Sequence, residues 1–289
     1  MVHRAGGDGE LPNAEHHVGL AGHLELICGL DSRGVSVLSH QSFRAPMHLS
    51  KPFHDAETLV VNVVNPTAGL LAGDRVRCEV KVQAGARLLL TTPSASRGHQ
   101  MHGDYAKLVQ RMHIADKGFL EFWPELFIPQ KGTCYVQQTE LFVEAGGDLL
   151  FFESLAPGRV ASGEAFAYCE LLWSTDVVCD NVLIGRERYC LTPDGEAVRA
   201  LRTAFAEAYY ASGFVISERL QGDSVWERIH ALHRDDAWVG CSRLLDRGWA
   251  IKVVAAGSIA LRRTLHHVRA ELYVAMGHAT PSLRRAGGL

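Results

Sequence analysis

A three-times-repeated unit limits the fold of this chain more than any other feature of its sequence. Each unit consists of the end of an alternating strand, a glycine turn and a mostly apolar strand, at residues 83–90, 115–122 and 144–151. The turns at Gly85, Gly118 and Gly147 lie 33 and 29 residues apart, a spacing typical of stacked units that form a coiled sheet. Glycine supplies the positive φ that such turns often require. An ordinary sandwich with similar hairpins fits the pattern equally well.

The strand signal runs from residue 22 to about residue 191. It is clearest at 75–83, where four apolar residues alternate with charged and amide side chains, so that one face is buried and the other meets water. The remaining expected strands are 23–28, 34–39, 58–64, 106–114, 133–143, 165–173, 213–219, 238–245 and 249–255.

Two helices are expected toward the C-terminal end. Residues 197–211 contain little glycine and no proline, and their apolar positions share one helical face. Ser258 is a candidate cap for a second helix, with Arg262, Arg263 and Arg269 away from its apolar face. That face consists of Leu261, Leu265, Val268, Leu272 and Met276. The expected fold is mainly β, with a flexible tail at 1–20 and a single domain at 21–285.

Composition excludes several classes of function. The net charge is −3 and no stretch of five or more basic residues occurs, so nothing attracts nucleic acid or anionic membranes. The seven cysteines are scattered without a C-x-x-C pair, which argues against disulfides and a thiolate zinc site. No apolar run is long enough to cross a bilayer, and the start lacks a signal peptide. A cytoplasmic protein is expected.

Catalytic signatures are missing from the sequence. It contains no G-x-x-x-x-G-K-[ST], no G-x-G-x-x-G after a strand, no H-E-x-x-H and no G-x-S-x-G. We therefore expect a protein that is not an enzyme. A hydrolase with an unrecognised site in the loops that contain Asp74 or Glu164 is the alternative.

Histidine is abundant, with fifteen copies. His99 and His102 stand three residues apart in the polar loop 97–104, where two imidazoles can share nickel, copper or zinc. The alternative is that both are ordinary exposed loop residues.

Two loops carry more polar residues than a simple connection needs. Residues 65–74 contain a proline, two glycines and a terminal Asp74, which indicates that a particular backbone path is required. Asp74 could instead only bond nearby backbone amides. Residues 157–164 have the same character, and an ion pair between Arg159 and Glu164 could fix that loop.

Four ordered segments resemble the urease accessory protein D family, also called the H type. Residues 65–74 resemble N-P-P-G-G-x-x-G-G-D, and 90–97 (LTTPSASR) are similar to L-T-T-P-x-A-[ST]-K. Residues 120–125 (LEFWPE) resemble L-E-[WY]-L-P-Q, and 158–166 resemble G-R-x-x-x-G-E-x-F. The resemblance is firm over 59–166 and fainter to residue 284.

The resemblance implies a coiled sheet with two helices, which decides between the coil and the sandwich. It also implies a scaffold that binds the urease apoprotein and recruits accessory protein F and, through it, the GTPase accessory protein G. The resemblance further implies that no cofactor is permanently bound and that Ni(II) passes transiently through an internal route. The positions that match this route are Asp74, Ser96, Glu153 and Glu187. Alternatively, Glu153 is a turn acceptor and Glu187 pairs with Arg186 or Arg188.

The chain departs from the family pattern at three places. Residues 98–102 (GHQMH) replace aromatic and basic residues, Glu125 replaces a glutamine, and the C-terminal Pro-Arg-x-Trp ending is reduced to 281–285 (PSLRR). The extra histidines and the altered ending leave open a scaffold that delivers metal to a different metalloenzyme.

Overall fold

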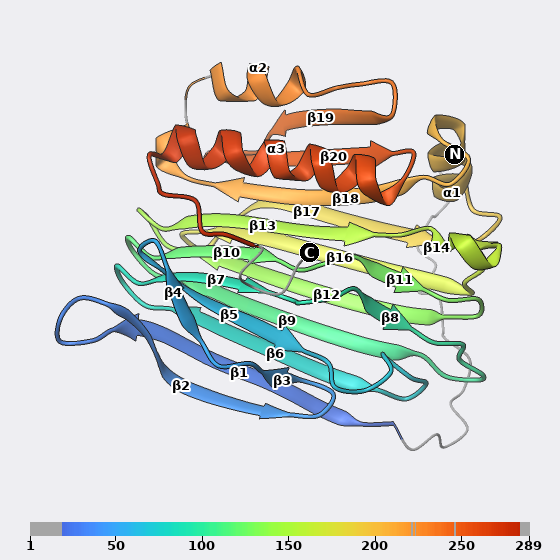
Figure 1. Cartoon of the computed structure of the whole chain (residues 1–289), viewed down its shortest axis with the longest axis horizontal. Coiled ribbons are helices and arrows are strands. Elements are labelled where there is room, and N and C mark those ends of the chain that lie inside the picture. Colours follow the sequence, from blue (N-terminus) through green and yellow to red (C-terminus); the bar gives the residue numbers. More distant parts are fainter. Residues whose placement is uncertain (1–18, 221, 223, 246, 284–289) are drawn as a thin grey trace, which may run out of the picture.

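Two large sheets form the body of the protein (Figure 1). The computed structural model describes residues 19–220, 222, 224–245 and 247–283. One sheet has seven strands in the order β17-β16-β12-β9-β6-β1-β2. The other has eleven, and its main path is β19-β20-β18-β13-β10-β7-β5-β3. A short two-stranded sheet, β14-β15, stands apart from both.

The first ten strands are β1 (Ala21–Leu30), β2 (Ser36–Arg44), β3 (His48–Leu49), β4 (Phe53–Asp55), β5 (Thr58–Val64), β6 (Arg75–Val82), β7 (Arg87–Thr91), β8 (Ser96–Gly98), β9 (Ala106–Ile114) and β10 (Phe119–Trp123). The others are β11 (Phe127–Pro129), β12 (Cys134–Val143), β13 (Asp148–Leu155), β14 (Gly158–Arg159), β15 (Glu164–Ala165), β16 (Glu170–Cys179), β17 (Val182–Leu191), β18 (Tyr209–Ile216), β19 (Ala237–Arg243) and β20 (Gly248–Ala255). The α-helices are α1 (Glu196–Ala204), α2 (Ser224–His230) and α3 (Ser258–Met276), and short 3-10 helices span Val160–Ser162 and Glu218–Leu220.

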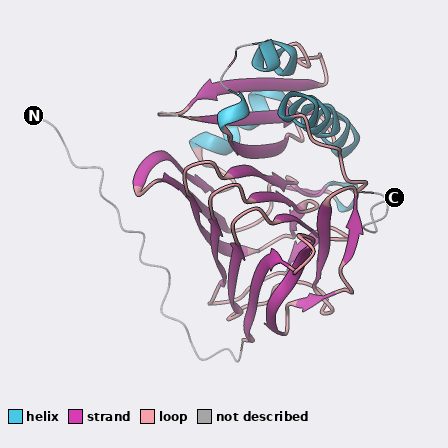
Figure 2. Ribbon diagram, turned by 90° about the vertical axis from the view of Figure 1, so that its left-hand side faces the viewer, coloured by secondary structure: helices cyan, strands magenta, loops and turns pink. Residues whose placement is uncertain are grey.

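The repeated unit of the sequence is one coil of the chain. In each of three coils a strand of the seven-stranded sheet (β6, β9, β12) is followed by a turn and a strand of the eleven-stranded sheet (β7, β10, β13). Equivalent strands pair in parallel and in register, as at Val80, Met112 and Leu141. Successive coils therefore stack and enclose the space between the sheets (Figure 2), which confirms the expected coiled sheet.

The positive backbone torsion of each turn falls at Gly85, Lys117 and Gly146, with φ of 73°, 56° and 74°. The turn prediction for Gly118 and Gly147 was therefore wrong by one residue. At these two positions a side chain would crowd the chain, because an added Cβ would lie 2.9 Å (Gly118) or 3.1 Å (Gly147) from the carbonyl oxygen of Ala115.

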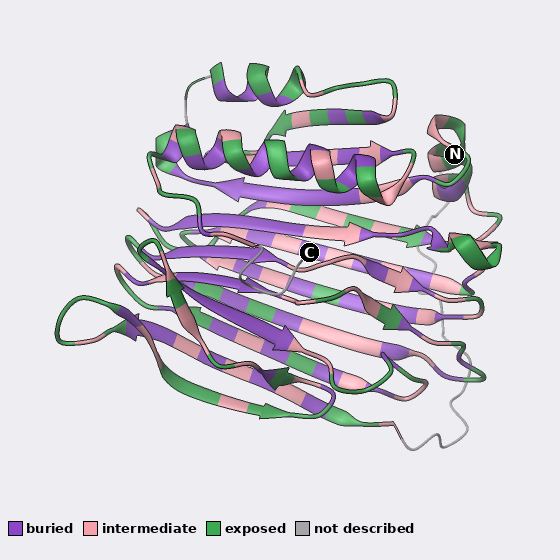
Figure 3. Ribbon diagram, in the orientation of Figure 1, coloured by how far each residue is buried: buried purple, intermediate pink, exposed green. Residues whose placement is uncertain are grey.

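The eleven-stranded sheet is apolar on both faces. Its inner face packs against the seven-stranded sheet, through residues such as Leu90 and Phe151. Its outer face is covered by α2 and α3, where Leu265 and Leu272 join the same cluster as Leu150. Residues along β6 are alternately buried and open to water (Figure 3), as the alternation predicts.

The helix predictions need three corrections. The first helix ends at Ala204 instead of 211, because Tyr209 already pairs with Ala255 in the ladder between β18 and β20. The seven-residue α2 was not predicted, since it is too short to give a helical period. The apolar face of α3 is buried as expected, but Arg269 is buried with it, and the N-cap is Gly257 without a side-chain cap.

The expected strand 165–173 is displaced, because only Glu164–Ala165 and Glu170–Cys179 are strands. The flexible tail expected at 1–20 lies outside the described residues except for 19 and 20. Of the altered ending at 281–285, residues 281–283 are described. Among the described residues, no helix is long and apolar enough to cross a membrane.

Candidate functional site

A polar row crosses the otherwise apolar space between the two sheets. On the seven-stranded sheet it consists of residues in register with one another: Cys78, Gln110, Thr139, Thr175 and Glu187. On the eleven-stranded sheet Glu153, Ser212 and Lys252 are in register in the same way. Because stacked coils place equivalent residues at the same height, each row follows the axis of the coil. The fold thus aligns side chains from separate strands into two rows, which together form the polar line.

A cavity of about 120 Å³ lies along this line, within the coils. Its wall is mainly apolar, with contributions from Leu108, Phe122 and Phe127. The polar exceptions include Gln110 and Gln137, which are both 3% exposed. A buried amide in an apolar wall is costly unless it has a hydrogen-bond partner.

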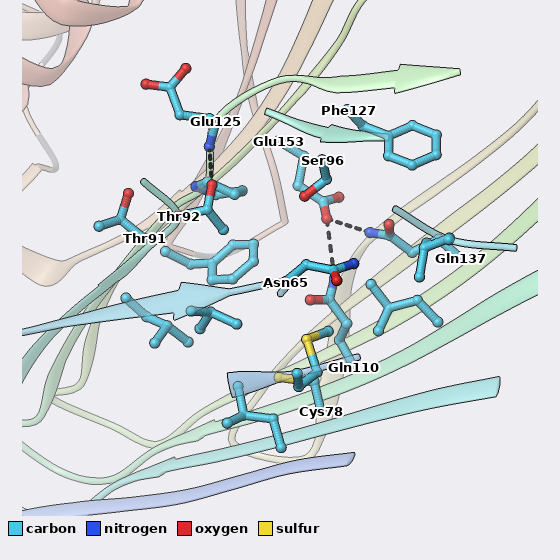
Figure 4. A pocket seen from close by; sticks show the side chains of 18 of the residues that line it. Asn65, Cys78, Thr91, Thr92, Ser96, Gln110, Glu125, Phe127, Gln137 and Glu153 are labelled. Atoms are coloured by element: carbon cyan, nitrogen blue, oxygen red, sulfur yellow. Dashed lines mark hydrogen bonds between the residues drawn. The ribbon is translucent and has the colours of Figure 1, made fainter. Parts of the chain in front are cut away.

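That partner is the carboxylate of Glu153 on β13 (Figure 4). Gln110 Nε2 donates to its Oε1 at 3.1 Å, Gln137 Nε2 donates to the same oxygen, and Trp173 Nε1 donates to Oε2 at 2.9 Å. Burial raises the pKa of Glu153 to about 7, although these donors oppose the shift. The cavity therefore holds an acid that titrates near neutral pH.

Glu187 on β17 forms the second acidic point of the line. Its Oε1 accepts a hydrogen bond from the Tyr210 hydroxyl at 3.1 Å, and its Oε2 accepts one from Ser212 Oγ at 2.6 Å. Lys252 Nζ donates to both Glu187 Oε1 and Ser212 Oγ. The alternative pairing of Glu187 with a neighbouring arginine is wrong, because the Arg186 and Arg188 side chains both reach Asp176.

A chain of aromatic rings connects the cavity with Glu187. Ring centroids are 5.5 Å apart between Tyr135 and Trp173, 5.9 Å between Trp173 and Tyr189, and 5.9 Å between Tyr189 and Tyr210. Trp173 donates to Glu153 and Tyr210 donates to Glu187, so two members of this chain orient the two carboxylates. Glu153 and Glu187 also interact electrostatically, since Glu187 contributes to the raised pKa of Glu153.

A second hollow, of about 240 Å³, lies beside the cavity. It is formed by the loop segments 65–69 and 92–97, which are parts of two of the family motifs. The two spaces share Val63, Asn65, Thr92 and Ser96 in their walls. Ser96 thus stands where the loop surface meets the interior (Figure 4). Of the four residues of the expected route, the cavity wall contains Ser96 and Glu153.

Asp74 is buried in the turn before β6. Its Oδ1 accepts a hydrogen bond from the amide of Leu20 at 2.9 Å and its Oδ2 accepts one from the amide of Leu71 at 2.8 Å. Only 2% of Asp74 is exposed, and it does not line the cavity. Its observed contacts fix the backbone of the 65–74 loop, as the structural alternative predicted.

His99 and His102 of the 97–104 loop are not part of a larger described group of metal-binding side chains. His99 Nε2 lies 2.9 Å from the carbonyl oxygen of Ala68, and His102 is exposed. Throughout the part of the chain that the structure describes, no group of three or more His, Cys, Asp or Glu residues is arranged to hold a metal ion. In the other loop, Arg159 and Glu164 form the expected ion pair, with Nε 2.8 Å from Oε2.

Sequence reasoning missed Gln110, Gln137, Trp173 and Lys252. For three of them the sequence contains an unusual feature, a polar residue at a position where a strand is expected to be apolar. Gln110 and Gln137 occupy inward positions in alternating strands, where an amide is unusual. Lys252 interrupts the apolar run of β20. Trp173 carried no such signal, because an inward tryptophan is an ordinary core residue.

Together these features define a coiled-sheet protein with a buried polar line in place of a closed metal centre. Comparisons with known proteins identify the family. The profile of the family described as UreD urease accessory protein matches residues 21–287. The chain therefore belongs to the UreD urease accessory protein family.

Several relatives named urease accessory protein UreD are similar over most of their length. The protein from Opitutus terrae is 43% identical over 258 residues, which cover 87% of this chain and 94% of the relative. The protein from Deinococcus radiodurans is 32% identical over 271 residues, which cover 91% of this chain and 94% of the relative. The one from Herpetosiphon aurantiacus is 30% identical over 245 residues, covering 83% and 84%.

Proposed function

We propose that this chain is a non-catalytic urease maturation factor that conducts Ni(II) along its interior polar line in the cytoplasm. One observation carries the proposal of a route. The hollow beside Ser96 and the cavity with Glu153 share wall residues, and the aromatic chain continues from this cavity to Glu187. Membership of the UreD family supports the connection with urease.

The chemistry of the line suits a travelling cation. Ni(II) is the cargo, so each point must bind it weakly enough to release it. Carboxylate, hydroxyl and amide oxygens at Glu153, Ser96 and Gln110 are weaker ligands for this ion than a set of imidazoles or thiolates, which would trap it. Asp74 is proposed to shape the entrance, because both of its oxygens accept hydrogen bonds from backbone amides.

The proposed partners are the urease apoprotein, accessory protein F and the GTPase accessory protein G. Support for them comes from the family resemblance alone. A scaffold of this kind needs no active site of its own, since the GTPase would provide the nucleotide chemistry. His99 and His102 stay a predicted point of first contact for metal at the loop surface.

The test is coexpression of the full chain with the urease subunits and accessory proteins F and G. We expect the chain to co-purify with them, and we expect Glu153→Ala to leave the complex intact while urease nickel content and activity fall at least about tenfold, as for loss of a buried charged ligand. Glu140→Ala is the matched control, because Glu140 forms an exposed pair with Arg111. Failure to co-purify would reject the scaffold, and unchanged nickel with Glu153→Ala would reject the route.

A further inference from the structure

Lys252 pairs with the carboxylate of Glu187, the acidic residue at one end of the polar line. Its Nζ donates to Glu187 Oε1 and to Ser212 Oγ, two oxygens that face the line from different sheets. Glu187 accepts a further hydrogen bond from the Tyr210 hydroxyl. The ammonium group thus binds a carboxylate oxygen and a hydroxyl oxygen, ligands of the kind that a small cation prefers.

The fold places this lysine at an edge of the coil. Glu187 belongs to β17, the last strand of the seven-stranded sheet, while Ser212 and Lys252 belong to β18 and β20, which continue the opposite sheet past that edge. The side chain of Lys252 is 35% exposed and that of Glu187 is 15% exposed. The pair therefore closes the line toward solvent at the end away from Ser96.

Lys252 has a second environment within reach. Its ammonium lies 5.3 Å from the ring centroid of Phe214 and 5.9 Å from that of Tyr210, distances at which an aromatic face attracts a cation. Because the flexible side chain of Lys252 is partly exposed, these rings and the solvent can stabilise the ammonium when it leaves Glu187.

We propose that Lys252 is a tethered competitor for the divalent cation at Glu187 and sets the low metal affinity of this point. The inference rests on the proposed nickel route, which it deepens. An incoming Ni(II) displaces the ammonium from Glu187 and Ser212, and the ammonium returns when the metal leaves. The carboxylate is thus never left unpaired at an edge of the core, and the metal is never held tightly.

Lysine fits this task better than arginine. Its ammonium is a compact point charge on a flexible chain, whereas a guanidinium would hold a carboxylate through two parallel hydrogen bonds. A competitor that must leave and return needs the weaker and more mobile contact.

The experiment measures Ni(II) binding to the full chain by titration calorimetry at fixed pH and ionic strength. Lys252→Met should bind Ni(II) at least about tenfold more tightly than the unchanged chain, since a positive charge next to the ligand is removed. Lys252→Arg should bind no more tightly than the unchanged chain. The double variant Lys252→Met with Glu187→Gln should lose the gain, which assigns the gained site to Glu187.

Lys81→Met is the matched control, because Lys81 is an exposed lysine on the outer face of β6. Lys252→Gln repeats the test with a side chain that can still donate to Glu187, in case the methionine variant does not fold. Equal Ni(II) affinity of the folded Met or Gln variants and the unchanged chain would overturn the inference.

The proposed function fails on a different result. If Lys252→Met gains affinity but Glu153→Ala leaves the nickel content of coexpressed urease unchanged, the competitor is supported and the delivery route is rejected.

Discussion

The indole Nε1 of Trp173 lies 2.9 Å from Oε2 of Glu153, and this contact joins the aromatic chain to the acid of the cavity. The two residues come from opposite sheets, since Trp173 lies on β16 and Glu153 on β13. The position of the Glu153 carboxylate is therefore set by the packing of one sheet on the other. The same packing buries the carboxylate and raises its pKa.

Stability should depend on pH through Glu153. Its pKa is raised from 4.5 to about 7, mainly by burial, so the folded chain holds a proton that the unfolded chain has released between these values. The contribution of Glu153 to the free energy of unfolding is fully present below about pH 4.5. It decreases as the pH rises to about 7, by on the order of 3 kcal/mol in total. Glu153→Gln removes this titration. Urea unfolding between pH 5 and 8 should give a flatter profile for the variant.

The control for this measurement is Glu140→Gln, since Glu140 lies in an exposed ion pair. Its profile should follow that of the unchanged chain. Parallel profiles for Glu153→Gln and the unchanged chain would show that Glu153 does not titrate in this range.

A buried ion pair should anchor helix α3. Arg269 and Glu121 have side chains that are 6% and 0% exposed, and Tyr273 also donates to Glu121. Arg269→Met should destabilise the chain by about 3–5 kcal/mol, because it leaves a buried carboxylate without its counter-charge. The double variant Arg269→Met with Glu121→Leu should recover much of this loss. Guanidinium unfolding measures the free energy of unfolding of both variants. A loss below about 1 kcal/mol for Arg269→Met would contradict the proposal that this ion pair anchors α3.

The sequence predicts the coil well and the polar line only in part. Alternation along β6 and the repeated turns are local patterns, so they predict strands, and the family resemblance decides for the coil over a sandwich. Glu121 and Arg269 are 148 positions apart, and no local pattern connects them. The contact between Glu187 and Lys252 likewise forms between sheets, because β17 at the edge of the seven-stranded sheet lies opposite β18 and β20 of the eleven-stranded sheet. The family motifs supplied Ser96 and Glu153, which line the cavity, but not their partners.

Asp74 should matter for the stability of the loop at the entrance. Asp74→Ala removes the acceptor of two backbone amides in a buried turn, which should cost about 1–3 kcal/mol. Asp74→Asn keeps one acceptor oxygen and should lose less. Thermal unfolding compares the two variants. In coexpressed urease, lower nickel content with both variants in an intact complex would support a role of the carboxylate in the route, whereas an effect of Asp74→Ala alone would indicate loop stability.

The turns of the coil provide the last prediction. Gly85, Lys117 and Gly146 are equivalent and all have positive φ, a conformation that a lysine adopts at a cost of roughly 1 kcal/mol. Lys117→Gly should therefore stabilise the chain by about 0.5–1 kcal/mol, since the exposed contact of Lys117 with Asp116 contributes little. Gly146→Ala should destabilise it by about 1–2 kcal/mol.

The control for the turns is Gly34→Ala, at a position with φ of 77° and no atom within 4 Å of an added Cβ. At Gly146 an added Cβ would also lie 2.3 Å from Asp116 Oδ1, so Gly146→Ala should lose at least as much stability as Gly34→Ala. Denaturant unfolding of the three variants gives the comparison. Destabilisation by Lys117→Gly would mean that Lys117 makes contacts worth more than its backbone strain. If Lys117→Gly raises the free energy of unfolding and Gly146→Ala lowers it, the coil repeats one backbone conformation at each turn. Glycine is then the residue best suited to that conformation, and the turn with Lys117 departs from it.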